Sequence, residues 1–528
     1  MGASVVLIHY WVYQIVSIND MINTINLRKK ENYYACFKYS KRTHDTKKGK
    51  NVMSSRQRLI QLLIGPVIFI LSVLLLSDVL TTSGAQAVGV AFWMIFWWIT
   101  RPVHITVTAI MPVVANAFLN MASMEPIIAQ YSSPAIILVF GSCLVTLPWA
   151  TIGLDRRVAL KALSLIGPSM KSQVTVWLLV SIFLSNLMPN VAVCAMFCPI
   201  AVSMLKAAGY DDIHSCEPAV PILLAIGWGV SLGGVGSPLA GAMNLAAISA
   251  LEGFTGEEFM YIDWVIHLAP FLIIATIVLL GCMLLMPMKV KSLEGTKEYF
   301  KKSYSELGPM KRDEKLCLAL ALLATIGAFT RPLYADILPG LAPAYIFLTI
   351  GFACFFITTN DNGFLLTWET AQKGTMWGMM ILFAGGLALG KLLNTSGAST
   401  SLSEIVTGLP LDGGALTIVA LVVFVRLITE VTNGTTAAAI CCPLVFELTT
   451  GIGLNPIPYW FITAMAYNAE FLLPISVRAI PVAYGLDAKK MLKSGIPVTI
   501  IHTIVVIICG YLFMKLWPTF NSLTYFSN

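Results

Sequence analysis

Two short polar clusters interrupt long apolar runs of this sequence, and each contains an asparagine. The first covers residues 185–190 and ends in Pro189-Asn190, and the second covers residues 429–436 and contains Asn433. An apolar segment of helical length follows each cluster, so each asparagine is expected to cap a helix whose first N–H groups lack partners. Helix starts carry partial positive charge and bind anions. Two of them brought together would suit a carboxylate or a sulfate, with helix capping alone as the alternative.

The second cluster is also rich in oxygen atoms. Its hydroxyl, amide and carbonyl oxygens are hard ligands of the kind that Na⁺ takes, and they come from Thr429, Thr432, Asn433 and Thr435. The sequence therefore predicts an anion site next to a sodium site.

Charged side chains also stand inside the apolar runs. Arg426 and Glu430 are spaced to share one helix face, which predicts a structural ion pair, with a substrate role as the alternative. Arg478 follows Pro474, and a lone guanidinium at that depth costs at least about 2.5 kcal/mol. Its anionic partner is either Glu470 or the bound substrate, whose carboxylate a planar guanidinium matches with two hydrogen bonds. A snorkelled position at the cytosolic or external surface is the third alternative.

The composition points to a membrane environment. The chain has 528 residues, of which 57% are hydrophobic and 12% are charged, and its mean hydropathy is +0.79. Soluble proteins carry roughly twice that charged fraction. Each crossing takes about 20 apolar residues, so the length leaves room for roughly ten to twelve elements. We predict an all-α integral membrane protein, multi-pass and located in the cell membrane.

Other functional classes lack their signatures in the sequence. The net charge of +7 comes from basic blocks between apolar runs, which indicates membrane topology rather than nucleic-acid binding. Nearly all of the 11 cysteines lie inside apolar runs, so we interpret them as buried side chains rather than disulfides or metal ligands. No nucleophile with a base and no HExxH-like cluster is present. We expect neither an enzyme nor a cofactor, apart from Na⁺ as a coupling ion.

The charged residues divide the chain into four regions. Residues 1–58 form a basic extension, which the positive-inside rule places in the cytoplasm, and residues 289–315 form a charged cytoplasmic linker. The remaining residues form two halves, 59–288 and 316–528. Each half has an interrupted apolar run and then a second break, and such matched breaks are typical of a secondary transporter with its substrate site between the halves. A chain beginning at Met53 is expected to insert and transport normally.

Two longer segments carry a family resemblance. "WETAQKGTMWGMMILFAGGLALGKLLNTSG" and "ITEVTNGTTAAAICCPL" are similar to blocks of the divalent-anion/sodium symporter family, which carries dicarboxylates, tricarboxylates and sulfate. The similarity extends from about residue 59 to about residue 517. It implies an inverted repeat of about 11 transmembrane helices with two re-entrant hairpins, a homodimer, and elevator movement of a transport domain against a scaffold.

The resemblance, matched position by position, implies functional residues in both halves. Together with the guanidinium considered above, the substrate contacts would be Asn190, Val191, Asn433, Gly434, Thr435 and Arg478. The sodium contacts would be Asn190, Ser231, Gly234, Thr429, Thr432, Gly434 and Ser476.

The chain departs from the family pattern at both hairpin tips. Pro189 and Val191 replace a serine and a threonine, and Gly434 replaces an asparagine, so both sodium sites lack side-chain oxygens. Besides a cation-coupled transporter of divalent anions, a sodium-independent exchanger or a proton-coupled carrier remains open, in which Arg478 supplies the positive charge. A transport-inactive paralogue with a regulatory role is the third alternative.

Overall fold

The structure is a computed structural model that describes residues 55–523, apart from Leu165, Asp361, residues 399–411, residues 432–433 and Ile475. The chain divides into two units, residues 1–60 and residues 61–528, and the architecture below is that of the second. Nearly all of the predicted extension, and with it Met53, lies outside the described residues.

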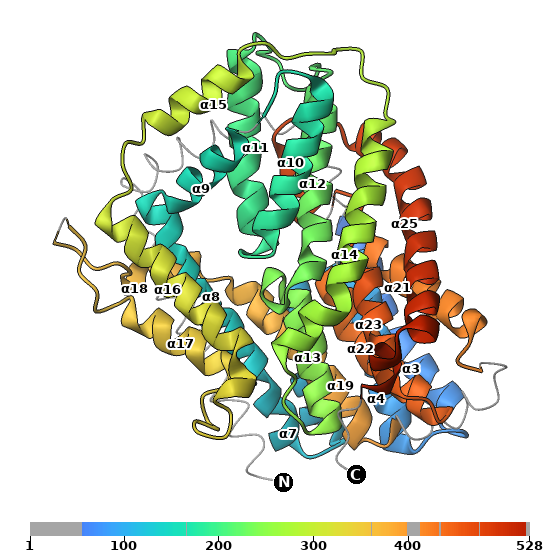
Figure 1. The fold of residues 1–528 in the computed structure, drawn as a ribbon. Coiled ribbons are helices and arrows are strands. Elements are labelled where there is room, and N and C mark those ends of the chain that lie inside the picture. Colours follow the sequence, from blue (N-terminus) through green and yellow to red (C-terminus); the bar gives the residue numbers. More distant parts are fainter. Residues whose placement is uncertain are drawn as a thin grey trace, which may run out of the picture. The chain divides into compact units, whose positions relative to one another are not determined.

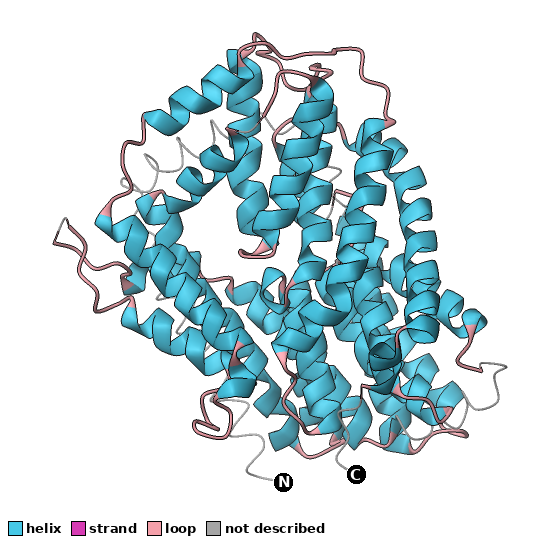
Figure 2. Cartoon of the chain, in the orientation of Figure 1, coloured by secondary structure: helices cyan, strands magenta, loops and turns pink. Residues whose placement is uncertain are grey.

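The described residues form helices joined by loops, with no β-strand among them (Figures 1 and 2). The helices up to the charged linker are α3 (Ser55–Leu76), α4 (Thr82–Thr100), α5 (Ile105–Thr108), α6 (Met111–Leu119), α7 (Met124–Ile128), η1 (Ala129–Ser132), α8 (Pro134–Ile152), α9 (Leu154–Leu163), α10 (Met170–Ser185), α11 (Asn190–Ala207), α12 (Ala219–Gly233), η2 (Gly234–Gly236), η3 (Pro238–Ala240), α13 (Ala242–Thr255) and α14 (Tyr261–Leu284).

The linker itself contains a helix, α15 (Thr296–Ser305). The helices that follow it are α16 (Arg312–Phe329), η4 (Arg331–Leu333), α17 (Pro343–Ala353), α18 (Trp368–Gly374), α19 (Trp377–Thr395), α21 (Ala415–Val431), α22 (Gly434–Gly451), α23 (Pro456–Tyr467), η5 (Ser476–Arg478), α24 (Ala479–Ala483), α25 (Ala488–Leu516) and α26 (Pro518–Ser522).

The length and apolar surface of these helices suit a bilayer. The described part of the chain contains 8 helical segments that are long and apolar enough to cross a membrane, and three shorter apolar helices. On α14, Ile273 and Ile277 are 61% and 65% exposed, while Leu268 and Phe271 on another face are fully buried. Lipid covers such outward apolar side chains at no cost, so the prediction of an all-α integral membrane protein is confirmed. The helix number and the re-entrant hairpins stay predictions.

Helices end where the sequence places its polar clusters. Helix α10 ends at Ser185 and α11 begins at Asn190, whereas α21 ends at Val431 and α22 begins at Gly434. Further along, short 3-10 turns separate α12 from α13, and a loop with one such turn follows α23. Helix α13, which precedes the linker, packs against α22, which follows it, and α22 packs against α23. The segments on either side of the linker therefore meet next to the breaks.

Candidate functional site

A cavity lies where the helix starts and the later breaks converge. It brings together six of the residues expected from the sequence: Asn190, Val191, Ser231, Gly434, Thr435 and Ser476. Apolar side chains form most of the remaining wall, among them Met243, Met376 and Met379. Residues from both sides of the linker thus line one space, as a site between two halves requires.

The start of α11 differs in detail from the expectation. Pro189, not Asn190, occupies the position before the first helical turn, and no side chain caps this end. The prediction that Asn190 caps the helix is therefore wrong. Asn190 instead lies in the first turn and lines the cavity, where its Oδ1 accepts a hydrogen bond from Ser185 Oγ. Ser185 Oγ also lies 2.9 Å from Val230 O, so its single proton is shared between two acceptors.

The start of α22 is already occupied by a carboxylate of the protein. The Gly434 N–H donates to Oε1 of Glu470, which is buried and also lines the cavity. An alanine at position 434 would place its Cβ 2.8 Å from Tyr467 O, so the close approach of the two segments depends on the missing side chain. Thr435 lies beside Gly434 in the wall. The expected partners Thr432 and Asn433 lie outside the described residues.

Arg478 does not line the cavity. Its fully buried guanidinium lies between two carboxylates, with Nη1 2.9 Å from Glu430 Oε2 and Nη2 2.9 Å from Glu470 Oε2. The first contact is a hydrogen bond. The second is an ion contact whose atoms are not aligned for one, since both Arg478 Nη2 and Glu470 Oε2 lack a hydrogen-bond partner among the described residues. Arg478 thus contacts Glu470, which is one of its two expected partners, and also Glu430.

Glu430 is the most heavily bonded group of this charged cluster. The predicted pair with Arg426 is confirmed, at 3.0 Å between Arg426 Nη2 and Glu430 Oε1. The same oxygen accepts from the Phe471 N–H at 3.1 Å, and Oε2 accepts from the Leu472 N–H at 3.1 Å. Those two amides belong to the break after α23, where they have no helical partner. Glu430 thus satisfies backbone donors that would be costly to leave unpaired in a membrane.

The predicted sodium ligands are only partly assembled. Ser231 and Ser476 line the cavity, and Gly234 lies behind it, where a Cβ would be 3.0 Å from Asn190 Nδ2. Thr429 is fully buried away from the cavity, and its hydroxyl donates to Val425 O at 2.7 Å. The hydroxyl and amide oxygens that do line the wall are hard ligands and fit Na⁺. Among the described residues, no group of three or more His, Cys, Asp or Glu could hold another metal.

Two asparagines that the sequence analysis overlooked connect the segments on either side of the linker. Asn468 lines the cavity and donates from Nδ2 to Asn244 Oδ1 at 2.9 Å. Asn244 donates in turn to Gly234 O at 2.6 Å and to Ser237 O at 2.9 Å, which pairs the carbonyls of the break after α12. The sequence contained a signal for both residues, since each asparagine stands inside an apolar run. A buried amide is costly unless its polar groups are paired, so a polar partner could have been expected for each.

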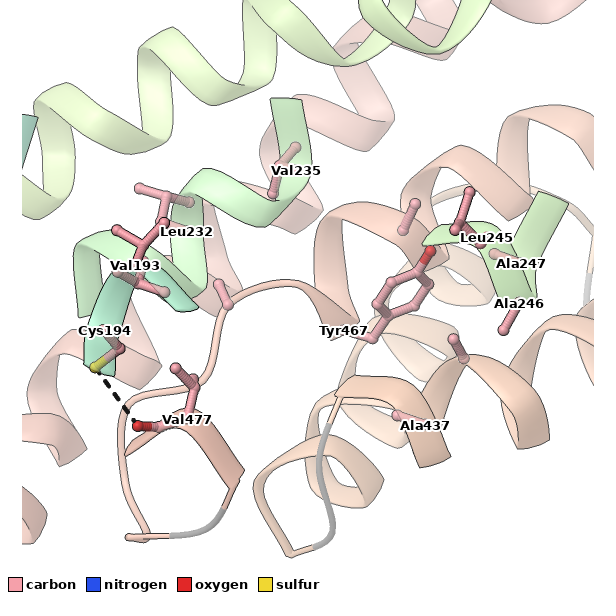
Figure 3. Close-up of a cluster of buried hydrophobic side chains, with 14 of the residues drawn as sticks. Val193, Cys194, Leu232, Val235, Leu245, Ala246, Ala247, Ala437, Tyr467 and Val477 are labelled. Atoms are coloured by element: carbon pink, nitrogen blue, oxygen red, sulfur yellow. Dashed lines mark hydrogen bonds between the residues drawn. The ribbon is translucent and has the colours of Figure 1, made fainter. Parts of the chain in front are cut away.

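Packing around the cavity joins the same segments. Figure 3 shows Val477 next to Cys194 of α11, with Cys194 Sγ 3.7 Å from Val477 O, and Val193 of the same helix beside Leu232 of α12. In the same view Tyr467 points its hydroxyl toward Leu245 of α13. The residues that surround the cavity are therefore held by apolar contacts as well as by the polar ones.

The chain is similar to several known proteins over most of its length. The family described as the sodium:sulfate symporter transmembrane region matches residues 56–520. The sodium-dependent dicarboxylate transporter SdcS of Staphylococcus saprophyticus is 27% identical over 474 residues, covering 86% of this chain and 91% of that protein. SdcS of Staphylococcus aureus strain MRSA252 is 28% identical over 498 residues, covering 90% and 94%. The structure of the Alcanivorax borkumensis YdaH transporter has a TM-score of 0.45 and 11% identity, covering 74% of this chain and 86% of that one.

The family match includes both helix starts, both later breaks and every residue that lines the cavity. It confirms the resemblance seen in the sequence. The chain belongs to the family of the sodium:sulfate symporter transmembrane region, a family of membrane transporters.

Proposed function

We propose that this protein is a secondary active transporter of small divalent anions, either dicarboxylates or sulfate, and that a cation drives it. The observation that carries the proposal is the cavity at which the starts of α11 and α22 converge, because two helix starts offer N–H donors and partial positive charge to an anion. The names of the SdcS relatives support a dicarboxylate and sodium. The family's description supports sulfate.

The family resemblance also supports a mode of movement. We propose a homodimer in which a transport domain containing the cavity moves as an elevator against a scaffold, with about 11 membrane helices and two re-entrant hairpins. In this arrangement the protein lies in the cell membrane with its N-terminus in the cytoplasm, and residues 289–315 link the two halves on the same side.

A sodium-independent anion exchanger is the second candidate. Thr429, an expected ligand of the second sodium site, donates its hydroxyl to Val425 O and does not line the cavity. An exchanger needs no coupling ion, so it would function without that ligand.

The test is uptake by the full chain reconstituted in proteoliposomes. Labelled succinate and sulfate are supplied with an inward sodium gradient, with choline replacing sodium, and as counterflow. Sodium coupling predicts accumulation that depends on the sodium gradient, and proton coupling predicts accumulation in choline when an inward proton gradient is imposed, whereas an exchanger shows counterflow alone. A protein that moves neither anion under any condition is transport-inactive, and the proposed function is then wrong.

The position of the site is tested by protection of a cysteine introduced at Val477. In the parent protein, succinate or sulfate should slow its modification. Asn190→Leu and Thr435→Leu should abolish this protection while leaving expression intact. Thr450→Leu, at the far end of α22 and outside the cavity, is the matched control and should leave protection in place. Normal protection in both cavity variants would remove the site from this cavity.

A further inference from the structure

Glu470 occupies the place that an anionic substrate would be expected to take. Its Oε1 accepts the N–H at the start of α22, and its Oε2 lies 2.9 Å from the Arg478 guanidinium. The helix start borders the cavity, and the Arg478 guanidinium lies behind its wall. Among the described residues that line the cavity, Glu470 has the only ionisable side chain. An entering dianion therefore meets a carboxylate that already binds the N–H at the start of α22.

The charges around Glu470 balance when it is ionised. Arg426 and Glu430 come from α21, and Arg478 comes from η5, so two guanidinium groups face two carboxylates and the net charge is zero. The other titratable groups packed nearby are Tyr467 on α23 and His502 on α25, whose ring lies 5.3 Å from that of Phe471. A proton on Glu470 would leave the cluster with one positive charge directly behind the cavity wall.

Glu470 rather than Glu430 is suited to take that proton. Glu430 accepts hydrogen bonds from two arginines and two backbone amides, and it does not line the cavity. Glu470 accepts from one amide, and its Oε2 contacts Arg478 without hydrogen-bond alignment. It is therefore the more weakly held carboxylate, and it is the one that borders the substrate space.

We propose that Glu470 binds the coupling proton, an inference that rests on the proposed anion transport and names the residue that couples it. A proton from the solution on the entry side adds to Glu470 as the anion enters, which frees the start of α22 for the substrate and leaves one net positive charge behind the cavity wall. On the exit side the anion leaves, the proton returns to solution, and Glu470 contacts Arg478 again. Anion and proton then favour each other's binding by the same factor.

Sodium-free proteoliposomes containing the full chain test this coupling. Sulfate is the preferred probe because it remains a dianion throughout the pH range used, and a trapped pH-sensitive dye reports proton movement. In the wild type, external sulfate should acidify the lumen. The apparent KM for sulfate should fall by up to about tenfold per pH unit of acidification, the limit for one coupled proton.

Glu470→Gln should abolish both sulfate-induced acidification and the pH dependence of KM. Glu252→Gln is the matched control, since Glu252 is a second carboxylate inside a membrane-domain helix, on α13, that borders a different cavity. It should behave as the wild type does. If succinate is the only anion carried, it serves as the probe, because Glu470→Gln experiences the same titration of the substrate as the wild type.

Three results would overturn the inference. The first is uptake of sulfate or succinate by the wild type with no proton movement. The second is a Glu470→Gln protein in which anion uptake still moves protons. The third is loss of proton coupling in Glu252→Gln or His502→Gln but not in Glu470→Gln. The first needs no variant, so the proposal can fail even if Glu470→Gln does not fold. Uptake that appears only when sodium is supplied, with no proton movement, is a case of the first result, whereas absence of anion transport both with and without sodium would instead defeat the underlying transport function.

Discussion

At the scale of single residues, spacing predicted one ion pair and could not predict the other contacts. Arg426 and Glu430 belong to the same helix, so their separation in sequence fixes their separation in space. Arg478 is separated from Glu470 by the break at Pro474 and from Glu430 by 48 positions in the sequence. No helical period connects these residues, and only the folded chain shows that two carboxylates share one guanidinium.

The bonds of Glu430 make it a structural group, and its replacement should destabilise the protein. Glu430→Gln removes the charge that holds Arg426 and Arg478, and breaking a buried pair in this way costs about 3 to 5 kcal/mol. We expect a marked fall in the melting temperature of the detergent-solubilised protein, with or without substrate.

Thr499→Val provides the comparison for Glu430. It removes a single 3.4 Å hydrogen bond to Glu430 Oε1 and keeps the side-chain shape, so it should cost about 1 kcal/mol or less. Equal melting temperatures for Glu430→Gln and Thr499→Val would show that Glu430 does not carry the stability assigned to it.

At the scale of elements, the sequence located both helix starts but not what binds them. Polar residues inside an apolar run predicted that helices begin near Asn190 and Gly434, and they do. The partner of the Gly434 amide is Glu470, which comes from a distant segment, and no local pattern reveals it. Asn190 was expected to cap α11 because asparagine often does so, but tertiary contacts place its side chain in the cavity instead.

The close approach at the start of α22 makes Gly434→Ala a decisive substitution. Alanine normally stabilises a helix relative to glycine by about 1 kcal/mol. Here its Cβ would lie 2.8 Å from Tyr467 O and 3.0 Å from Glu470 Oε1, so α22 must move away from the break. We expect lower thermal stability and loss of anion uptake.

Gly281→Ala on α14 is the matched control for Gly434→Ala. Apart from the nearby backbone of α14 itself, no heavy atom of the described residues lies within 4 Å of the added Cβ at position 281, so helix propensity acts there without a clash. This variant should keep its transport and be as stable as the wild type or more so. If Gly434→Ala behaves in the same way, the start of α22 is not closely packed against the break.

At the scale of the whole molecule, composition and matched breaks predicted more than any single motif. A chain with 57% hydrophobic residues must place most of its helices in lipid, and two interrupted runs predicted one shared site. The structure brings Asn190 and Gly434 to one cavity. Contacts between the segments, such as Asn244 with Asn468, could not be predicted because they depend on how the helices pack. The prediction that a chain beginning at Met53 inserts and transports normally concerns residues 1–52, which lie outside the described residues, so it stays a prediction.

The charged linker contains an ion pair that connects α9 with α16, and the sequence did not predict this contact. Arg157 on α9 donates from Nε to Glu314 Oε1 at 2.8 Å and from Nη1 to Gly308 O at 2.8 Å. Glu314 Oε2 also accepts from the Lys311 N–H at 2.7 Å, at the start of α16. Both side chains are buried. One ion pair thus connects the segment before the linker to the first helix after it.

This ion pair should make stability depend on pH in the acid range. Burial by itself raises the pKa of the Glu314 carboxyl, but the hydrogen bonds from Arg157 and from the Lys311 N–H outweigh it, so the pKa lies below its ordinary value of 4.5. A carboxyl whose pKa is lowered by folding contributes stability above its unfolded pKa and loses that contribution as the pH falls through the folded value. We expect the melting temperature of the wild type to fall as the pH is lowered below about 4.5.

Variants of the pair separate this effect from general acid denaturation. Glu314→Gln should lower the melting temperature at neutral pH, and it should also reduce the further fall in acid because its side chain does not titrate. Glu298→Gln replaces an exposed glutamate on α15 and should follow the wild type at every pH. The melting temperatures of the three proteins, measured from neutral pH to below the ordinary glutamate pKa of 4.5, show how much of the fall in acid comes from Glu314. Parallel curves for Glu314→Gln and the wild type would show that the Arg157–Glu314 pair does not carry the acid-sensitive stability.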